Sequence, residues 1–148
     1  MSSTYVSLHF HLIFSTKYRT PNIDAEWRAR LHEYLGGTVH GLDGVPQCIG
    51  GTNDHVHLLV GLKSTHCIAD VIREIKKASS GWVHDTIGVR DFGWQIGYAA
   101  FTVSPTACGD VRRYIEHQEE HHKTKTFLEE LIELLERAGI EYDPKYLE

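Results

Sequence analysis

The order of strand-like and helix-like segments constrains the fold of this chain more than any other feature. Alternating, β-rich sequence lies at residues 5–14, 45–50, 55–62 and 94–103. Helical periodicity marks residues 24–39, which follow the first of these segments, and residues 67–84, which precede the last. Between the second and third strands, the stretch GGTND at residues 50–54 predicts a hairpin turn. The predicted order is therefore β-α-β-β-α-β.

This order is typical of the ferredoxin-like fold, an α+β architecture in which an antiparallel sheet carries helices on one face. Its first and third strands are central neighbours. Two more helices are predicted after the fourth strand. One begins near Pro105 and continues past Tyr114, and the other spans residues 125–138 and ends at Gly139. With 148 residues, we expect residues 1–148 to form a single ferredoxin-like domain with added C-terminal helices.

Composition excludes several classes of protein. No apolar run approaches the roughly 20 residues that span a bilayer, and the N-terminus lacks the pattern of a signal peptide. The three cysteines are odd in number and contain no CxxC pair, which argues against a cysteine-type zinc site. We therefore expect reduced thiols, a cytoplasmic location and no membrane partner.

The net charge of −5 is unevenly distributed along the chain. Residues 114–148 contain ten acids and four bases, whereas residues 1–113 contain ten acids and eleven bases. Basic clusters occur at residues 16–20, 73–77 and 112–113. Such clusters either line a phosphate-binding surface or belong to solvated helix faces.

Two histidine pairs suggest a metal site. His55 and His57 lie in the third strand, where residues i and i+2 share a face roughly 7 Å apart. Two neutral imidazoles at this distance can bind one divalent cation, although a solvent-facing pair of polar residues gives the same pattern. We expect the aliphatic face of the strand to meet the helices and the histidine face to be open. His9 and His11 repeat the spacing in the neighbouring first strand and can assist such a site.

The stretch RRYIEHQEEHH, residues 112–122, offers a third ligand and a nucleophile. Tyr114 and Gln118 are four residues apart and share a helix face. A tyrosine hydroxyl attacks a phosphodiester when its phenolate is favoured, because its ordinary pKa is about 10. A nearby cation and a neutral Gln ligand suit that chemistry, whereas the alternative is that Tyr114 is a core aromatic. The other histidines of the stretch show no regular ligand spacing, so we expect them on the surface; they are His117, His121 and His122.

Together, NDHVHLLV, RRYIEHQ and the first-strand FHLIFSTKYR resemble the single-tyrosine HUH transposases, which comprise small insertion-sequence enzymes and their REP-associated relatives. HUH denotes histidine, hydrophobic residue, histidine, matched by His55, Val56 and His57. The resemblance covers essentially the whole chain. It assigns the family's catalytic tyrosine to Tyr114 and its polar third metal ligand to Gln118. It also makes the first histidine pair supporting sheet structure.

The resemblance implies a specific reaction. Members bind single-stranded DNA folded as an imperfect hairpin, and their tyrosine attacks a nearby phosphodiester to give a 5′-phosphotyrosine and a free 3′-OH, which later attacks another phosphotyrosine. The usual metal is Mg²⁺ or Mn²⁺, although the ligands alone leave zinc open. The family implies a homodimer in which a mobile helix carrying Tyr114 can complete the partner's site, with Gly109 as the candidate hinge. Two rival functions remain: a non-catalytic hairpin-binding regulator, and a metal-dependent phosphohydrolase that uses water.

On this resemblance, the basic clusters and one tryptophan become candidate DNA contacts. Phosphate contacts are expected from Lys17, Arg19, Lys76 and Lys77. Trp82 either stacks on an unpaired base or packs a helix end into the core. Arg112 and Arg113 either steady the scissile phosphate or pair with neighbouring glutamates.

The acidic C-terminal segment is longer than a minimal transposase needs and resembles the REP-associated branch. It carries an apolar stripe of Phe127, Leu128, Leu131, Leu134 and Leu135. This stripe packs either on its own core or against a second subunit.

Overall fold

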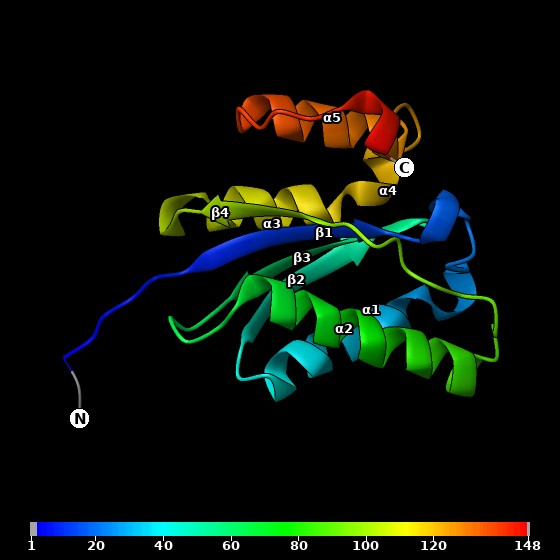
Figure 1. The fold of residues 1–148 in the computed structure, drawn as a ribbon, viewed down its shortest axis with the longest axis horizontal. Helices are drawn as coiled ribbons and strands as arrows, with labels where there is room; N and C mark the ends of the chain where they lie inside the picture. Colours follow the sequence, from blue (N-terminus) through cyan, green and yellow to red (C-terminus); the bar gives the residue numbers. More distant parts are fainter. Residues whose placement is uncertain (1–2, 148) are drawn as a thin grey trace.

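The structure, a computed structural model, describes residues 3–147 and contains the predicted ferredoxin-like sheet (Figure 1). Four antiparallel strands lie in the order β2-β3-β1-β4. Their bounds are His9–Ser15 for β1, Val45–Gly51 for β2, His55–Gly61 for β3 and Ala99–Val103 for β4. The expectation that the first and third strands are central neighbours is confirmed, and Ser15 of β1 pairs with His55 of β3.

Two helices cover one face of this sheet, as predicted (Figure 1). They are α1, Ala25–Gly41, and α2, Ile68–Trp82. Helix α1 begins where Asp24 accepts a hydrogen bond from the backbone N–H of Glu26 at 2.8 Å, which satisfies a free donor of the first turn. The main core forms between these helices and the aliphatic face of the strands; fully buried members include Leu12, Leu31, Leu35, Val56, Leu58 and Ile75.

The second face of the sheet is covered by the C-terminal helices (Figure 1). These are α3, Cys108–Glu116, α4, Gln118–His121, and α5, Phe127–Arg137. Our expectation of an open histidine face is therefore wrong, because His55 and His57 are both 0% exposed. The stripe of α5 packs on the protein's own chain, with Phe127 and Leu135 buried, and this packing excludes solvent from the histidines.

Helix α3 lies directly on β2, and a glycine makes this possible. A Cβ atom added at Gly50 would lie 2.5 Å from the carbonyl oxygen of Ile115 and 2.8 Å from its Cγ2. Ile115 itself is buried. The missing side chain thus sets how closely the helix that carries Tyr114 approaches the sheet.

Several boundaries differ from those predicted. The fourth strand is limited to Ala99–Val103, because Trp94 makes only an isolated bridge to Thr16 while its ring packs edge-on against Phe14. The helix predicted from Pro105 opens with a short 3₁₀ turn and ends at Glu116. Within residues 3–147, no helix combines the length and apolarity that crossing a membrane requires.

Candidate active site

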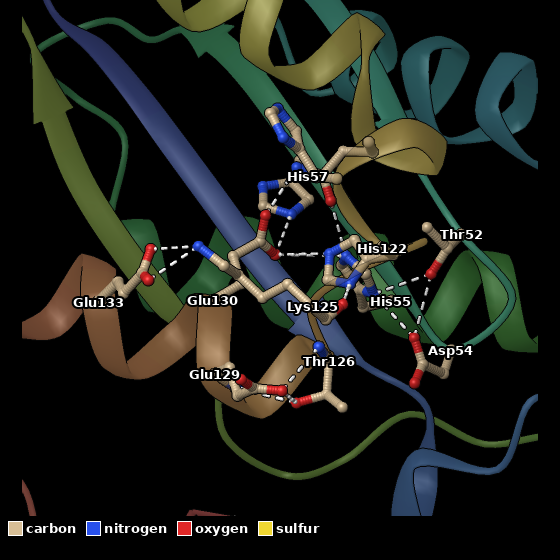
Figure 2. A network of polar contacts seen from close by, with 12 residues as sticks. Thr52, Asp54, His55, His57, His122, Lys125, Thr126, Glu129, Glu130 and Glu133 are labelled. Carbon is tan, nitrogen blue, oxygen red and sulfur yellow. Dashed lines mark hydrogen bonds and ion pairs between the residues drawn. The ribbon is translucent and has the colours of Figure 1, made fainter.

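A buried carboxylate on α5 lies at the centre of a cluster of imidazoles (Figure 2). Glu130 is 2% exposed. Its Oε1 lies 3.0 Å from His57 Nε2, 3.2 Å from His122 Nε2 and 3.4 Å from His55 Nε2. Two of these histidines come from β3, and the third follows α4. Three imidazole nitrogens therefore converge on one oxygen atom.

The second oxygen of this carboxylate contacts the nucleophile predicted from the sequence. Glu130 Oε2 accepts a hydrogen bond from Gln118 Nε2 at 2.7 Å and another from the hydroxyl of Tyr114. Gln118 is buried, and its Oε1 lies 2.8 Å from His55 Nε2. Although the chain breaks its helix at His117, both side chains still reach the same carboxylate.

Each imidazole of the cluster is oriented by a partner at its outer nitrogen. The Nδ1 atoms of His55, His57 and His122 lie 2.8 Å from Asp54 Oδ1, 2.7 Å from His11 Nε2 and 2.6 Å from the carbonyl oxygen of Lys125, respectively. Because the outer nitrogen is engaged, Nε2 faces inward in all three rings.

Burial and hydrogen bonding shift the pKa values in opposite directions. Burial lowers the pKa of His55, but hydrogen bonds to Asp54, Glu130 and Gln118 outweigh it and raise this pKa to about 9. Burial dominates at His57 and lowers its pKa to about 4. In this state, His55 is therefore protonated on both ring nitrogens near neutral pH, whereas His57 is neutral.

The two acidic groups of the site are also shifted. Burial favours the neutral form of Glu130, but hydrogen bonds from His122, His55 and His57 hold its pKa below the usual range. Burial, followed by the hydrogen bond to Glu130, raises the pKa of Tyr114. The tyrosine therefore keeps its proton in this state, and positive charge near its oxygen is needed to favour the phenolate.

The donor atoms fit a divalent cation. The ligand atoms of His55, His122 and Glu130 all lie within 4.8 Å of one another. The imidazole Nε2 of His57 and the amide oxygen of Gln118 border the same cluster. Imidazole, carboxylate and amide donors together suit several divalent metals.

The structure brings together the predicted Tyr114, His55, His57 and Gln118, but it also adds residues that the sequence reasoning missed. His122, expected on the surface, lies in the cluster with only 11% of its side chain exposed. Glu130 was not considered at all. The sequence feature that could have identified Glu130 is its place as an acidic residue on the apolar face of a helix, three residues after Phe127 and four before Leu134.

The two residues of the first histidine pair differ in position. His11 joins the site through His57, and burial, followed by the charge of His57, lowers its pKa to about 3. His9 lies away from it, with Nδ1 2.9 Å from Gln47 Oε1. The first pair therefore contributes one outer contact to the site.

Three of the candidate DNA contacts lie on α2, which covers the face of the sheet opposite to α3 and α5 (Figure 1). The Lys76 ammonium donates hydrogen bonds to the backbone carbonyl oxygens of residues 95, 96 and 97. Burial lowers the pKa of Lys76 to about 8. Trp82 stacks on Tyr34 with ring centroids 5.1 Å apart. Lys77 is exposed. The bonding of Lys76 and the stacking of Trp82 give both residues structural contacts.

The remaining candidate contacts flank the site. Lys17 is exposed just beyond the end of β1, and Arg19 donates to the carbonyl of Leu147 at 3.0 Å. Arg112 and Arg113 are exposed on α3, where Arg113 pairs with Asp110. Contact of any of these residues with DNA stays a prediction.

Two solved structures resemble the fold of this chain. A candidate transposase from Deinococcus radiodurans R1 has a similar structure, with 26% sequence identity and a TM-score of 0.66 over 80% of this chain and 95% of that chain. A REP-associated tyrosine transposase bound to a REP hairpin shares the fold, with 13% identity and a TM-score of 0.54 over 80% of this chain and 68% of that chain. None of the curated proteins matches the chain.

A family model described as "Transposase IS200 like" matches residues 4–118. This range includes all four residues predicted for the catalytic and metal site, which are His55, His57, Tyr114 and Gln118. The matched region ends before His122 and Glu130, so these two residues lie outside it. The match covers well over half of the sequence, and the chain therefore belongs to the IS200-like transposase family.

Proposed function

We propose that this protein cleaves and rejoins single-stranded DNA at hairpin-marked ends through a covalent bond between Tyr114 and a DNA 5′-phosphate. One observation carries the proposal. The Tyr114 hydroxyl bonds to the carboxylate of Glu130, on which His55 and His57 also converge. A nucleophile that touches a potential cation site matches the requirement of phosphodiester cleavage.

The proposed reaction is a transesterification that conserves the number of phosphoester bonds. The oxygen of Tyr114 attacks the phosphorus, a Tyr–O–P bond forms, and the bond from phosphorus to the 3′-oxygen breaks. The hydrogen bond to Glu130 Oε2 orients the tyrosine hydroxyl, which gives up its proton as the phenolate forms, and one proton ends on the leaving 3′-OH. In the reverse direction, a 3′-OH attacks the phosphotyrosine and restores Tyr114, so no ATP is needed.

The surrounding residues have separate tasks in this proposal. When bound, an Mg²⁺ or Mn²⁺ ion polarises the phosphate and stabilises the phenolate. His55, His57 and Gln118 hold that ion, while Asp54 orients His55 through its Nδ1. The exposed bases near the site supply phosphate contacts; they are Lys17, Arg112 and Arg113.

The family and one structural neighbour support a proposal for the substrate and the oligomeric state of this protein. The REP-associated transposase that shares this fold is bound to a hairpin, and we extend a hairpin-forming single strand to this chain as its substrate. We also propose a cytoplasmic homodimer, consistent with the three free cysteines among the described residues.

Covalent trapping tests the proposal. The protein is incubated with Mn²⁺ and end-labelled single strands copied from the palindromes that flank its gene, and adducts are resolved on a denaturing gel. Wild type should form an adduct, whereas Tyr114→Phe should form none and bind the hairpin within about twofold of wild type, because only a hydroxyl is lost. Tyr142→Phe is the matched control. The hydroxyl of Tyr142 also donates a hydrogen bond to a glutamate, Glu136, but Tyr142 lies in the C-terminal segment after α5 and contacts none of the predicted site residues in this bond.

The same gel separates the rival functions. Cleaved strand without an adduct would indicate a hydrolase that uses water. Binding without cleavage in all proteins would indicate a regulator. An adduct with Tyr114→Phe at the wild-type level would remove this residue from the mechanism.

A further inference from the structure

We propose that Glu130 and His122 bind the cation together with His55, His57 and Gln118, and that this five-residue site selects Mn²⁺, Co²⁺ or Zn²⁺ over Mg²⁺. The inference rests on the proposed function for the identity of the site and defines the class of ion that the site takes. It adds two ligands from the C-terminal segment, beyond the residues that the family model matches.

The distances within the cluster support shared coordination. Protein nitrogen and oxygen donors lie about 2.0–2.2 Å from a first-row divalent ion, so two donors on one ion are about 2.9–3.5 Å apart. Glu130 Oε1 lies 3.0, 3.2 and 3.4 Å from the Nε2 atoms of His57, His122 and His55. A fourth separation, between His55 Nε2 and Gln118 Oε1, is 2.8 Å, slightly shorter than this range. Three of these four separations lie within that range, and the ligand atoms of His55, His122 and Glu130 all lie within 4.8 Å of one another.

The orientation of His122 matches that of the other two histidines. Metal-bound histidines commonly donate their second N–H to a carboxylate or a backbone carbonyl. His122 does so through Nδ1 to the carbonyl of Lys125 at 2.6 Å, as His55 does to Asp54 at 2.8 Å. In both rings this leaves Nε2 directed at Glu130 (Figure 2). A surface histidine has no need of this arrangement.

The burial of Glu130 also requires an explanation. It is 2% exposed on a helix whose neighbouring residues Phe127 and Leu135 are buried apolar groups. A buried carboxylate is costly unless charged or hydrogen-bonding partners surround it. Here the partners are three imidazole nitrogens that all face one carboxylate oxygen, so the burial of Glu130 is compensated within the proposed cation site.

The composition of the site determines the class of ion. Mg²⁺ prefers oxygen donors and retains several waters. Imidazole suits later first-row ions such as Zn²⁺, and the affinity of a site with nitrogen and oxygen donors rises along that row from Mn²⁺ to Co²⁺, so a shell with three imidazoles and one carboxylate favours these ions over Mg²⁺. Glu130 Oε2 additionally holds the Tyr114 hydroxyl, which makes Glu130 a positioning residue that links the cation to the nucleophile.

Metal titration of the full chain without DNA tests the proposal. Chelator-stripped protein is titrated calorimetrically with Mn²⁺, Zn²⁺ and Mg²⁺. Wild type should bind one Mn²⁺ per chain, with Mg²⁺ at least about tenfold weaker. Glu130→Gln and His122→Gln should each weaken Mn²⁺ binding at least about tenfold, because even outer-shell changes cost 10- to 100-fold.

Two controls match these variants in chemistry. Glu133→Gln changes an exposed carboxylate of the same helix, which pairs with Lys125. His40→Gln changes an exposed imidazole at the end of α1. Both should bind Mn²⁺ as wild type does. The visible absorption of Co²⁺-loaded wild type gives a second measurement, which needs no variant to fold and should report a shell of five or more donors.

The outcomes are distinguishable from failure of the proposed function. Wild-type Mn²⁺ affinity in folded Glu130→Gln and His122→Gln, or tighter binding of Mg²⁺ than of Mn²⁺, would overturn the inference while leaving Tyr114 chemistry in place. A four-coordinate Co²⁺ spectrum would overturn it as well. Conversely, intact metal selectivity with no covalent DNA adduct would support the five-residue site and contradict the proposed function.

Discussion

Replacing Gly50 with alanine tests whether the position of α3 on β2 determines activity. The added Cβ would lie 2.5 Å from the carbonyl oxygen of Ile115, whereas ordinary contact begins near 3.4 Å. Helix α3 must therefore move outward by about 0.9 Å, or β2 must bend by as much. The nearest atom belongs to the backbone, so it cannot give way as the flexible end of a side chain would.

The expected cost has a structural and a functional part. Overpacking of this kind costs about 1–3 kcal/mol in the free energy of unfolding. The shift also moves Tyr114 and Gln118, which come from α3 and the start of α4. Because a misplacement of about 1 Å can reduce a rate about 100-fold, adduct formation should fall by about that factor.

Gly61→Ala is the matched control in the same sheet. Its added Cβ would meet Val45 Cβ at 3.6 Å and His9 Nδ1 at 3.7 Å, both ordinary contacts. Urea unfolding followed by tryptophan fluorescence measures stability, and covalent trapping on labelled single-stranded DNA measures activity. If Gly50→Ala were as stable and as active as Gly61→Ala, α3 would not be seated on its own β2 in solution, and the argument would fail.

Three further predictions concern the histidines and assembly. His55→Ala and His57→Ala should each abolish Mn²⁺ binding and adduct formation, whereas His9→Ala should keep both in the same assays; the reverse result would show that the wrong pair was chosen. In chelator-treated protein, the pKa of His11 is about 3 in the folded state, against an ordinary value of 6.5. Between these two pH values the unfolded chain therefore binds more protons than the folded chain, and the free energy of unfolding falls as the pH drops below about 6.5. The fall contributed by this group is at most about 1.4 kcal/mol per pH unit, and urea titrations at several pH values should show a shallower dependence for His11→Gln; an equal slope would argue against it. Tyr114 lies beside His57 of its own chain. Mixing the Tyr114→Phe and His57→Ala proteins, with subunit exchange verified, should therefore give no covalent adduct. Recovery of adduct to about half the wild-type level per dimer would mean that the subunits exchange α3.

The strand and helix order was readable from the sequence because hydrophobic periodicity is a local property. Alternation placed His55 and His57 on one face of β3, and the pattern of the sheet placed β1 beside it. The spacing of Tyr114 and Gln118 predicted that they lie close together, which is correct, but they share no single helix face because the chain breaks its helix at His117. Each of these inferences depends only on residues a few positions apart, or on the small set of topologies that a β-α-β-β-α-β order allows.

The contacts of Glu130 and His122 were decided only by the tertiary structure. Glu130 is 73 residues from His57 in the sequence, and nothing local indicates that α5 folds back over the sheet and brings the two within 3.0 Å. The same packing buries the histidines and turns an expected open face into a closed polar cluster. Periodicity predicts which face of a helix is buried, but the surface that buries it depends on how all the elements pack together, since packing is a property of the whole chain.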